Sequence, residues 1–260
     1  MAFKTWRTGV HIQQDRIFAV ALTKERSTWN LRRWWQIPLD PGIIREGQII
    51  QPEQLVAALS AWSKALPHHH RIFLAFPAAR TLQKALPCPA LTLCESEQTA
   101  WIASAISREL EMAPDALCFD YVQDTLTRSF QVTAAQNKEV AALLTLAKTL
   151  RLHIAAITPD AGALANLLLS LEPSAQCAVW RDENHWLWAT RHQWGRKPLA
   201  EAETVPELAA ILALKPEEMA LFAANSLDPF SLVIRYLPPL PECGADFTIA
   251  LALAMGEIVE

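Results

Sequence analysis

The chain has 260 residues, of which 52% are hydrophobic and 19% are charged, and its formal net charge is −4 at neutral pH. A chain of this length and apolar content can bury a large core, so we expect one large domain or two tightly joined ones. The acidic balance and the scattered Lys and Arg residues supply no basic surface for a phosphate backbone, which disfavours direct binding of nucleic acid.

No segment has the pattern of a membrane-targeting or membrane-spanning element. The first nine residues hold no continuous apolar stretch of the kind found in a signal peptide. The apolar run at 247–255 is about half of the ~20 residues that a bilayer span requires. The five cysteines form no C-x-x-C pair, which is typical of reduced thiols in a cytosolic protein. We therefore expect a cytoplasmic chain without direct membrane insertion, whose membrane role depends on a partner.

The first part of the chain has the pattern of three strands, a helix and a further strand. Alternating apolar residues separated by turn residues predict strands at 10–13, 17–23 and 29–37. Apolar residues spaced along one helical face predict a helix at 52–64, and an apolar run predicts a strand at 71–76. The predicted order of this half is therefore β-β-β-α-β.

An extra block is predicted next, at 87–156. Thr92 and Glu95 form a T-x-x-E capping box that opens a helix ending at Glu111. The block continues with two strands, a helix and a strand, at 116–122, 128–133, 135–150 and 152–158. This α-β-β-α-β order is that of a small inserted subdomain. Beyond it, Asp160 is expected to cap an apolar helix at 161–171.

The last part of the chain repeats the order of the first. Three strands, a helix and a strand are predicted at 176–181, 185–190, 193–199, 206–214 and 219–223. Asp246 is expected to cap a buried terminal helix at 247–258. The predicted domains are a first half at 1–86 with 157–172 and 246–260 packed on it, an insert at 87–156, and a reduced second half at 173–245.

Several segments within this frame carry a family resemblance as a set. They include Ile43-Ile44-Arg45-Glu46-Gly47-Gln48-Ile49-Ile50, Ala156-Ile157-Thr158-Pro159-Asp160 and Trp186-Leu187-Trp188-Ala189-Thr190. Together they resemble the PilM family of type IV pilus assembly proteins, in particular its shorter enterobacterial members, over nearly the whole chain. The resemblance implies an FtsA-related, actin-like (ribonuclease H-like) α/β fold: two duplicated β-β-β-α-β halves with a small α+β subdomain inserted in the first half. It also implies a role in type IV pilus-like assembly, competence and DNA utilisation.

Nucleotide-binding relatives present glycines and carboxylates to ATP at three places, and the resemblance locates these places in this chain. In the first hairpin, G-x-D-x-G-S, His11 stands at the Asp and Gln13 at the second Gly. In the second, D-x-G, Trp180 stands at the Asp. The third place, a Gly-Gly turn beneath the adenine, has no glycine here. The degenerate positions are His11, Gln13, Trp180, Asp182 and Ala224. With only 7 glycines in the chain, close approach of backbone to a phosphate is disfavoured, so no cofactor is expected.

Other polar and aromatic groups favour structural roles. The histidines at 68–70 are expected in a solvated loop, since three adjacent side chains cannot all face one ion, and no metal site is expected. His11 and His153 are expected to be hydrogen-bonded structural residues. Most of the 10 tryptophans are expected in the core and in cross-strand pairs, although an exposed subset would suit peptide binding. The serines within 96–107 have no paired histidine, so no catalytic residue is assigned.

Family members hold the short cytoplasmic N-terminal tail of PilN, a bitopic inner-membrane protein, in a cleft of the first half near the insert. By resemblance, the residues at the base of the insert that would contact such a PilN-like tail are Phe76, Pro77, Arg80 and Leu82. The leading hypothesis is a non-catalytic cytoplasmic adaptor, peripheral to the inner membrane through this partner. Two alternatives remain: an actin-like ATP-binding protein or ATPase of pilus assembly with degenerate phosphate loops, and a polymer-forming cytoskeletal protein.

Overall fold

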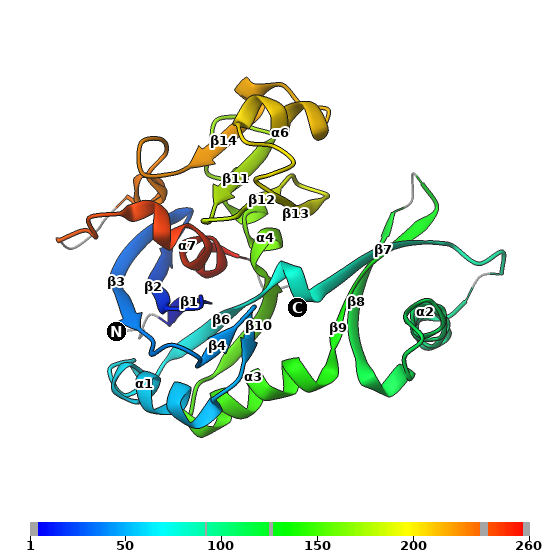
Figure 1. Ribbon diagram of the computed structural model, residues 1–260, viewed down its shortest axis with the longest axis horizontal. Helices are drawn as coiled ribbons and strands as arrows, with labels where there is room; N and C mark the ends of the chain where they lie inside the picture. Colours follow the sequence, from blue (N-terminus) through cyan, green and yellow to red (C-terminus); the bar gives the residue numbers. More distant parts are fainter. Residues whose placement is uncertain (1–4, 92, 125–126, 235–238, 257–260) are drawn as a thin grey trace. The chain divides into compact units, whose positions relative to one another are not determined.

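The computed structural model describes residues 5–91, 93–124, 127–234 and 239–256. It divides into two compact units, one formed by 1–79 with 147–260 and the other by 80–146 (Figure 1).

The first unit contains a five-stranded sheet in the order β10-β6-β1-β2-β3. Strands β1, β2 and β3 form an antiparallel meander, and β6 and β10 extend the sheet in parallel to β1. The helix α1 packs against β3. The bounds are β1 Trp6–Ile12, β2 Arg16–Glu25, β3 Thr28–Pro38, β6 His70–Phe76, β10 Ile154–Pro159 and α1 Pro52–Lys64, with the short hairpin β4 Ile44–Arg45 and β5 Gln48–Ile49 between β3 and α1.

A second, four-stranded sheet in the same unit repeats this plan in the order β13-β12-β11-β14. Again three strands form an antiparallel meander, a helix follows, and the last strand returns parallel to the first. The bounds are β11 Cys177–Arg181, β12 His185–Ala189, β13 Trp194–Pro198, α6 Val205–Ile211 and β14 Met219–Phe222, with the 3-10 turns η3 Pro216–Glu218 and η4 Pro229–Leu232 on either side of β14.

Three short helices lie between the two sheets and join their cores. Helix α4 (Asp160–Ala163) contacts β6, β10, β12 and β13, and α5 (Ala165–Leu168) contacts β11. Helix α7 (Thr248–Met255), preceded by the 3-10 turn η5 (Gly244–Phe247), is buried along its whole length and packs on β1, β2 and β6. Apolar residues of both sheets and of these helices therefore form one continuous core.

Gly9 explains how closely α7 approaches the five-stranded sheet. A Cβ at this position of β1 would overlap the carbonyl oxygen of Ala250 and would lie 2.8 Å from the backbone nitrogen of Ala254. Real Cβ atoms do not approach backbone atoms so closely, so only glycine fits here. At the C-terminal end of α7, the Arg7 guanidinium donates to the Ala254 carbonyl (Nε–O 2.9 Å) and to the Gly256 carbonyl. These contacts satisfy carbonyls that a helix end leaves without partners.

The second unit is a three-stranded sheet, β7-β9-β8, with a helix on one face. Its strands are antiparallel, and every second residue of each strand packs beneath α2, around Ile102, Ile106 and Phe130. The bounds are β7 Thr81–Pro87, α2 Glu95–Leu110, β8 Leu117–Asp124, β9 Ser129–Gln136 and α3 Asn137–Thr149, with the 3-10 turns η1 Ala78–Arg80 and η2 Pro114–Ala116.

Two parts of the predicted insert are corrected by the strand pairing. The strand predicted at 152–158 was assigned to the insert, but β10 pairs with β6 in the five-stranded sheet. The segment 81–87, for which no strand was predicted, is β7 and pairs with β9 along its whole length. The three-part division of the chain otherwise stays a prediction.

Several predicted caps are also corrected. Thr92 lies outside the described residues, and the capping box of α2 is formed by Cys94 with Glu97, whose carboxylate accepts from the Cys94 backbone (2.9 Å). Asp246 lies within a 3-10 turn and does not cap the terminal helix, whose N-cap residue is Phe247. That helix ends at Met255, and the predicted continuation over 257–258 lies outside the described residues.

The histidine run differs from the prediction at one position. His70 does not lie in a solvated loop: it begins β6, is buried, and stacks on His153 with ring centroids 4.9 Å apart. Its Nδ1 lies 2.7 Å from the Pro67 carbonyl, and its Nε2 lies 3.3 Å from the backbone N–H of His153. Both ring nitrogens are therefore used by the backbone, which indicates a structural role.

Candidate functional site

The five degenerate nucleotide positions lie in the first unit, near the ends of strands. β1, β6 and β10 run parallel and end at one edge of their sheet, and β11 and β14 end together in the other. Ligands of open α/β sheets bind beyond such carboxyl ends. His11 lies in β1, Trp180 in β11, and Ala224 in the exposed turn after β14. These strand ends are therefore where a nucleotide would bind, or where other side chains would fill its place.

His11 and Trp180 contact each other where relatives would hold phosphate. Their rings meet edge to face, with centroids 5.7 Å apart and an interplanar angle of 78°. The Trp180 indole donates to the Ala245 carbonyl (Nε1–O 2.8 Å), and the Gln13 amide lies 3.5 Å from Nδ1 of His11. Both rings are buried, and burial lowers the pKa of His11 to about 4. Near neutral pH the pair is therefore an uncharged imidazole against an indole.

Neither hairpin has the loop that cradles a phosphate. The β1–β2 connection closes with a bond from the Gln13 N–H to the Arg16 carbonyl (2.9 Å), and the β11–β12 connection closes similarly from the Asp182 N–H to the His185 carbonyl (3.0 Å). Both turns are tight and lack glycine. In each turn, the backbone N–H of the first residue is therefore committed to closing the hairpin.

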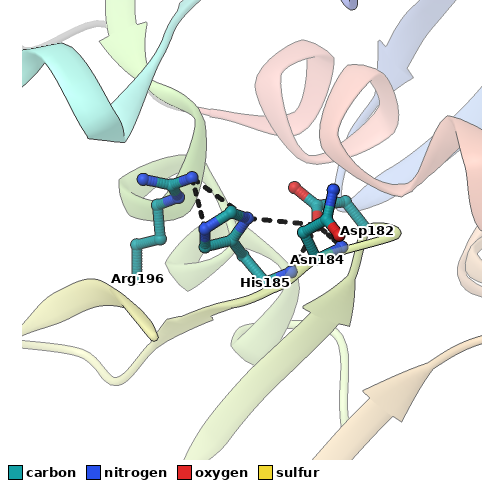
Figure 2. A network of polar contacts seen from close by, with 4 residues as sticks. All are labelled: Asp182, Asn184, His185 and Arg196. Atoms are coloured by element: carbon teal, nitrogen blue, oxygen red, sulfur yellow. Dashed lines mark hydrogen bonds and ion pairs between the residues drawn. The ribbon is translucent and has the colours of Figure 1, made fainter. Parts of the chain in front are cut away.

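Asp182 organises the second hairpin together with two basic side chains. Its Oδ1 accepts from the backbone N–H groups of Asn184 (2.7 Å) and His185 (2.5 Å), which is the bonding of a turn aspartate. The same oxygen lies 3.6 Å from Nδ1 of the His185 ring, and Arg196 Nη2 lies 2.6 Å from Nε2 of that ring (Figure 2). The network ties the turn to the neighbouring strand β13.

Asp160 is a buried carboxylate at the end of β10. Its Oδ1 accepts from the backbone N–H of Ala161 (2.6 Å) and of Ala78 (2.9 Å), so it holds the segment that follows β6. Burial raises its pKa to about 6, although these two hydrogen bonds and the charge of Arg196 oppose the shift. Asp160 was predicted to cap a helix at 161–171, but it is the first residue of α4, whose N-cap residue is Pro159. The predicted helix is also divided into the two short helices α4 and α5.

The four predicted partner contacts already have contacts within the protein. Phe76 ends β6 and is only 4% exposed, and Pro77 is half-buried beside it. In the second unit, both guanidinium arms of Arg80 are hydrogen-bonded by the Glu139 carboxylate, whose side chain is 9% exposed. Leu82 packs beneath α2. A role for these residues in partner binding stays a prediction.

Sequence reasoning missed His185 and Arg196. In the β12–β13 register, His185 lies opposite Pro198 and Arg196 opposite Leu187, so the two side chains are diagonal neighbours on one face. Such pairs interact across a hairpin. The alternation of the two strands would have brought them together once the turn at 190–193 had been placed.

Groups of metal-ligating side chains and membrane-spanning helices are two further features that bear on function. Within residues 5–91, 93–124, 127–234 and 239–256, no three His, Cys, Asp or Glu side chains are grouped so as to hold a metal ion. No helix of the described chain has the length and apolar character that crossing a bilayer requires.

The comparisons with known proteins agree with this fold. The structure of the PilM–PilN type IV pilus biogenesis complex includes a chain that is similar with a TM-score of 0.70 and 14% identity, over 95% of this chain and 97% of that one. The cytoplasmic domain of EpsL, an inner-membrane component of the type II secretion system of Vibrio cholerae, is similar with a TM-score of 0.59 and 12% identity, over 94% of both chains. No family model matches the sequence.

The duplicated sheets and these similarities define an α/β protein of the actin-like fold, as predicted. In sequence, the chain is 49% identical to the DNA utilization protein HofM of Escherichia coli (strain K12). The 257 aligned residues cover 99% of both chains. The chain belongs to the HofM family, and its structure is similar to PilM.

Proposed function

We propose that the protein is a non-catalytic cytoplasmic adaptor of a type IV pilus-like, DNA-utilisation apparatus. It binds the N-terminal cytoplasmic tail of a PilN-like inner-membrane protein and is peripheral to that membrane through this partner. Membership of the HofM family supports the apparatus, and the fold shared with PilM, solved in complex with PilN, supports the partner. In this proposal the protein acts by binding its partner through its surface, and it neither uses a cofactor nor catalyses a reaction.

The contact between His11 and Trp180 carries the non-catalytic part of the proposal. A phosphate site needs a positive or N–H-rich surface and a carboxylate to hold the metal-bound water. Here the two side chains at the carboxylate positions are an imidazole and an indole, 5.7 Å apart and buried. Because burial keeps the pKa of His11 near 4, the imidazole offers no positive charge to a phosphate near neutral pH.

A thermal melt with and without millimolar Mg-ATP tests this part. A ligand at 100 times its Kd stabilises a protein by ~2.7 kcal/mol, and each kcal/mol shifts the Tm of a domain of this size by roughly 2–4 °C. We expect no shift for the native chain. A shift of several degrees that is lost on substitution of Gln13 or Asp182 would contradict the proposal and support the ATP-binding alternative.

Titration with the partner's tail tests the adaptor part. The probe is a fluorescent synthetic peptide of the cytoplasmic N-terminus of the PilN-like protein from the same genome, and a scrambled peptide is the control. We expect saturable binding of the first peptide only. Absence of binding at high micromolar concentration contradicts the adaptor proposal. In cells, the protein should move from the membrane fraction to the soluble fraction when the partner's tail is deleted.

A further inference from the structure

We infer that the end of the five-stranded sheet at which β6 and β10 begin is a second contact of the protein with the inner membrane, made with the phosphate groups of anionic phospholipids. The inference rests on the proposed function, because the partner's tail is what brings the protein to that membrane. Four exposed cations carry it, and we call them the basic end: Lys64, Arg71, Lys148 and Arg151.

The fold brings two distant segments of the chain together at this end. The connection from α1 to β6 spans 65–69, and the connection from α3 to β10 spans 150–153. They are tied to each other by a bond from the Ile72 N–H to the His153 carbonyl (2.8 Å) and by the stacked rings of His70 and His153. Basic residues that the sequence led us to expect as scattered are therefore gathered at one place.

No ion pair with a described residue balances the charge of the basic end. The sequence contains no Asp or Glu from 54 to 94 or from 140 to 159. The acidic residues that precede these stretches, Glu53 and Glu139, lie in the first turns of α1 and α3, whereas the basic end lies where both helices finish. At 1.5 Å of rise per residue, this separates the charges by roughly 15 Å, which exceeds the Debye length of ≈ 8 Å at physiological ionic strength.

The proposed partner places an anionic surface beside the protein. Its tail leaves the membrane directly, so a protein that holds this tail stays close to the lipid headgroups, and a weak second contact then acts at a high effective concentration. The cytoplasmic leaflet has a negative surface potential, and each Lys or Arg near it strengthens binding roughly fivefold. Four cations can therefore add substantially to a contact that the tail begins, and they need no insertion into the hydrocarbon.

The surroundings of the basic end also favour headgroups over nucleic acid. Trp6 is half-buried at the start of β1 and donates its backbone N–H to the His69 carbonyl (3.0 Å), so an indole lies beside this end. Tryptophan is enriched at the level of the headgroups in membrane-associated proteins. A protein that binds DNA neutralises more phosphates, about 6–10, and four cations on a chain with a net charge of −4 are few for that purpose.

The test is flotation of the full chain with vesicles of phosphatidylcholine, with and without phosphatidylglycerol, at millimolar lipid. We expect binding to the anionic vesicles only, and weaker binding as salt is raised. The double variant Arg71→Gln with Arg151→Gln should weaken this binding by about tenfold or more. Arg45→Gln with Arg191→Gln removes the same charge from exposed positions elsewhere in the same unit and should bind as the native chain does.

A single variant separates charge from folding. Arg151 has a φ of +56°, a conformation that glycine adopts without strain, so Arg151→Gly should weaken vesicle binding roughly fivefold without lowering the Tm. Melting curves of the two double variants serve as the further control. The full chain is used because 257–260, which include two glutamates, lie outside the described residues.

Three outcomes would overturn the proposal. One is equal binding of the native chain to both kinds of vesicle, and another is an equal loss of binding in the two double variants. The third is failure to bind anionic vesicles; if a short DNA duplex or polyglutamate binds instead and Arg71→Gln with Arg151→Gln weakens that binding, the basic end belongs to another anion.

The partner's tail, attached to lipid in the same vesicles, separates this proposal from the adaptor proposal. In phosphatidylcholine alone, the tail should recruit the native chain and the double variant Arg71→Gln with Arg151→Gln equally. Added phosphatidylglycerol should strengthen recruitment of the native chain much more than that of the variant, and equal strengthening overturns the membrane contact alone. Absence of recruitment in phosphatidylcholine overturns the adaptor proposal, and the vesicles without the tail then decide the basic end.

Discussion

Replacing Gly9 by alanine is expected to destabilise the protein strongly, because the added methyl group has no space. It would overlap the Ala250 carbonyl oxygen and lie 2.8 Å and 2.9 Å from the Ala254 nitrogen and the Ala250 carbonyl carbon. All three atoms belong to the backbone of α7, so no side chain can rotate away. Since carbon atoms pack at ≈ 3.5–4.0 Å, α7 would have to move back by roughly 1 Å or more.

The expected cost follows from the surroundings of α7. Every residue of this helix is buried, and it packs on three strands of the five-stranded sheet, so its displacement opens gaps along that whole contact. Overpacking of a core costs typically 1–3 kcal/mol. Because the overlap is with backbone, we place Gly9→Ala at the upper end, ~3 kcal/mol or more. At roughly 2–4 °C per kcal/mol, the Tm should fall by about 6–12 °C.

Urea and thermal unfolding followed by tryptophan fluorescence measure this change, and two further variants isolate its cause. Gly42→Ala is the control, since Gly42 has a φ of +87° but its Cβ would meet nothing nearer than 3.5 Å. It should cost only the roughly 1–2 kcal/mol of left-handed strain. Adding Ala250→Gly to Gly9→Ala should give no rescue, because the overlap is with the carbonyl of residue 250. Rescue, or a loss no greater than that of Gly42→Ala, would refute the reasoning.

Three further predictions concern charged groups. Burial raises the pKa of Asp160 to about 6, so ionisation of this carboxyl weakens the folded state as pH rises from about 4 to 6. In urea denaturation, Asp160→Asn should therefore be more stable than the native chain near pH 7 but not near pH 4, and an equal difference in stability at both pH values would count against this. Burial lowers the pKa of His11 to about 4, so the native chain should lose stability as pH falls from about 6.5 to 4. His11→Gln should reduce that loss in the same assay, and an unchanged dependence of the unfolding free energy on pH would contradict the prediction. A double-mutant cycle of Arg80→Ala and Glu139→Ala should give a coupling energy of about 1–2 kcal/mol, because the pair is bidentate and half-buried. A coupling energy near zero would contradict this.

The duplicated architecture could be predicted from sequence because each strand and helix carries its own periodicity. The apolar faces that predicted a helix at 52–64 and strands at 71–76 and 219–223 correspond to α1, β6 and β14. The strand β7 was missed because its exposed Gln83 and Ala85 and its terminal Pro87 give no apolar run. The strand β10 was placed in the wrong sheet because pairing depends on the tertiary fold and periodicity says nothing about it.

The candidate site could be located from sequence only by its departures from the nucleotide motifs. The positions of His11 and Trp180 within the two motifs identified them, but their contact could not be predicted because it depends on how the two sheets pack together. The tie of Asp160 to Ala78 spans 82 residues, and no local pattern indicates such a bond.

The packing of α7 on β1 has a consequence for how the protein is made. Arg7 and the Ala254 carbonyl that it binds are 247 residues apart in the sequence. At a synthesis rate of ≈ 5–20 residues per second, β1 therefore leaves the ribosome roughly 12–50 s before the helix that covers it has been translated. During that interval the meander β1–β2–β3 exposes the apolar face on which α7 will pack. Nascent chains should thus depend on a holding chaperone, and premature termination before residue 248 should leave a chain that aggregates instead of a smaller folded domain.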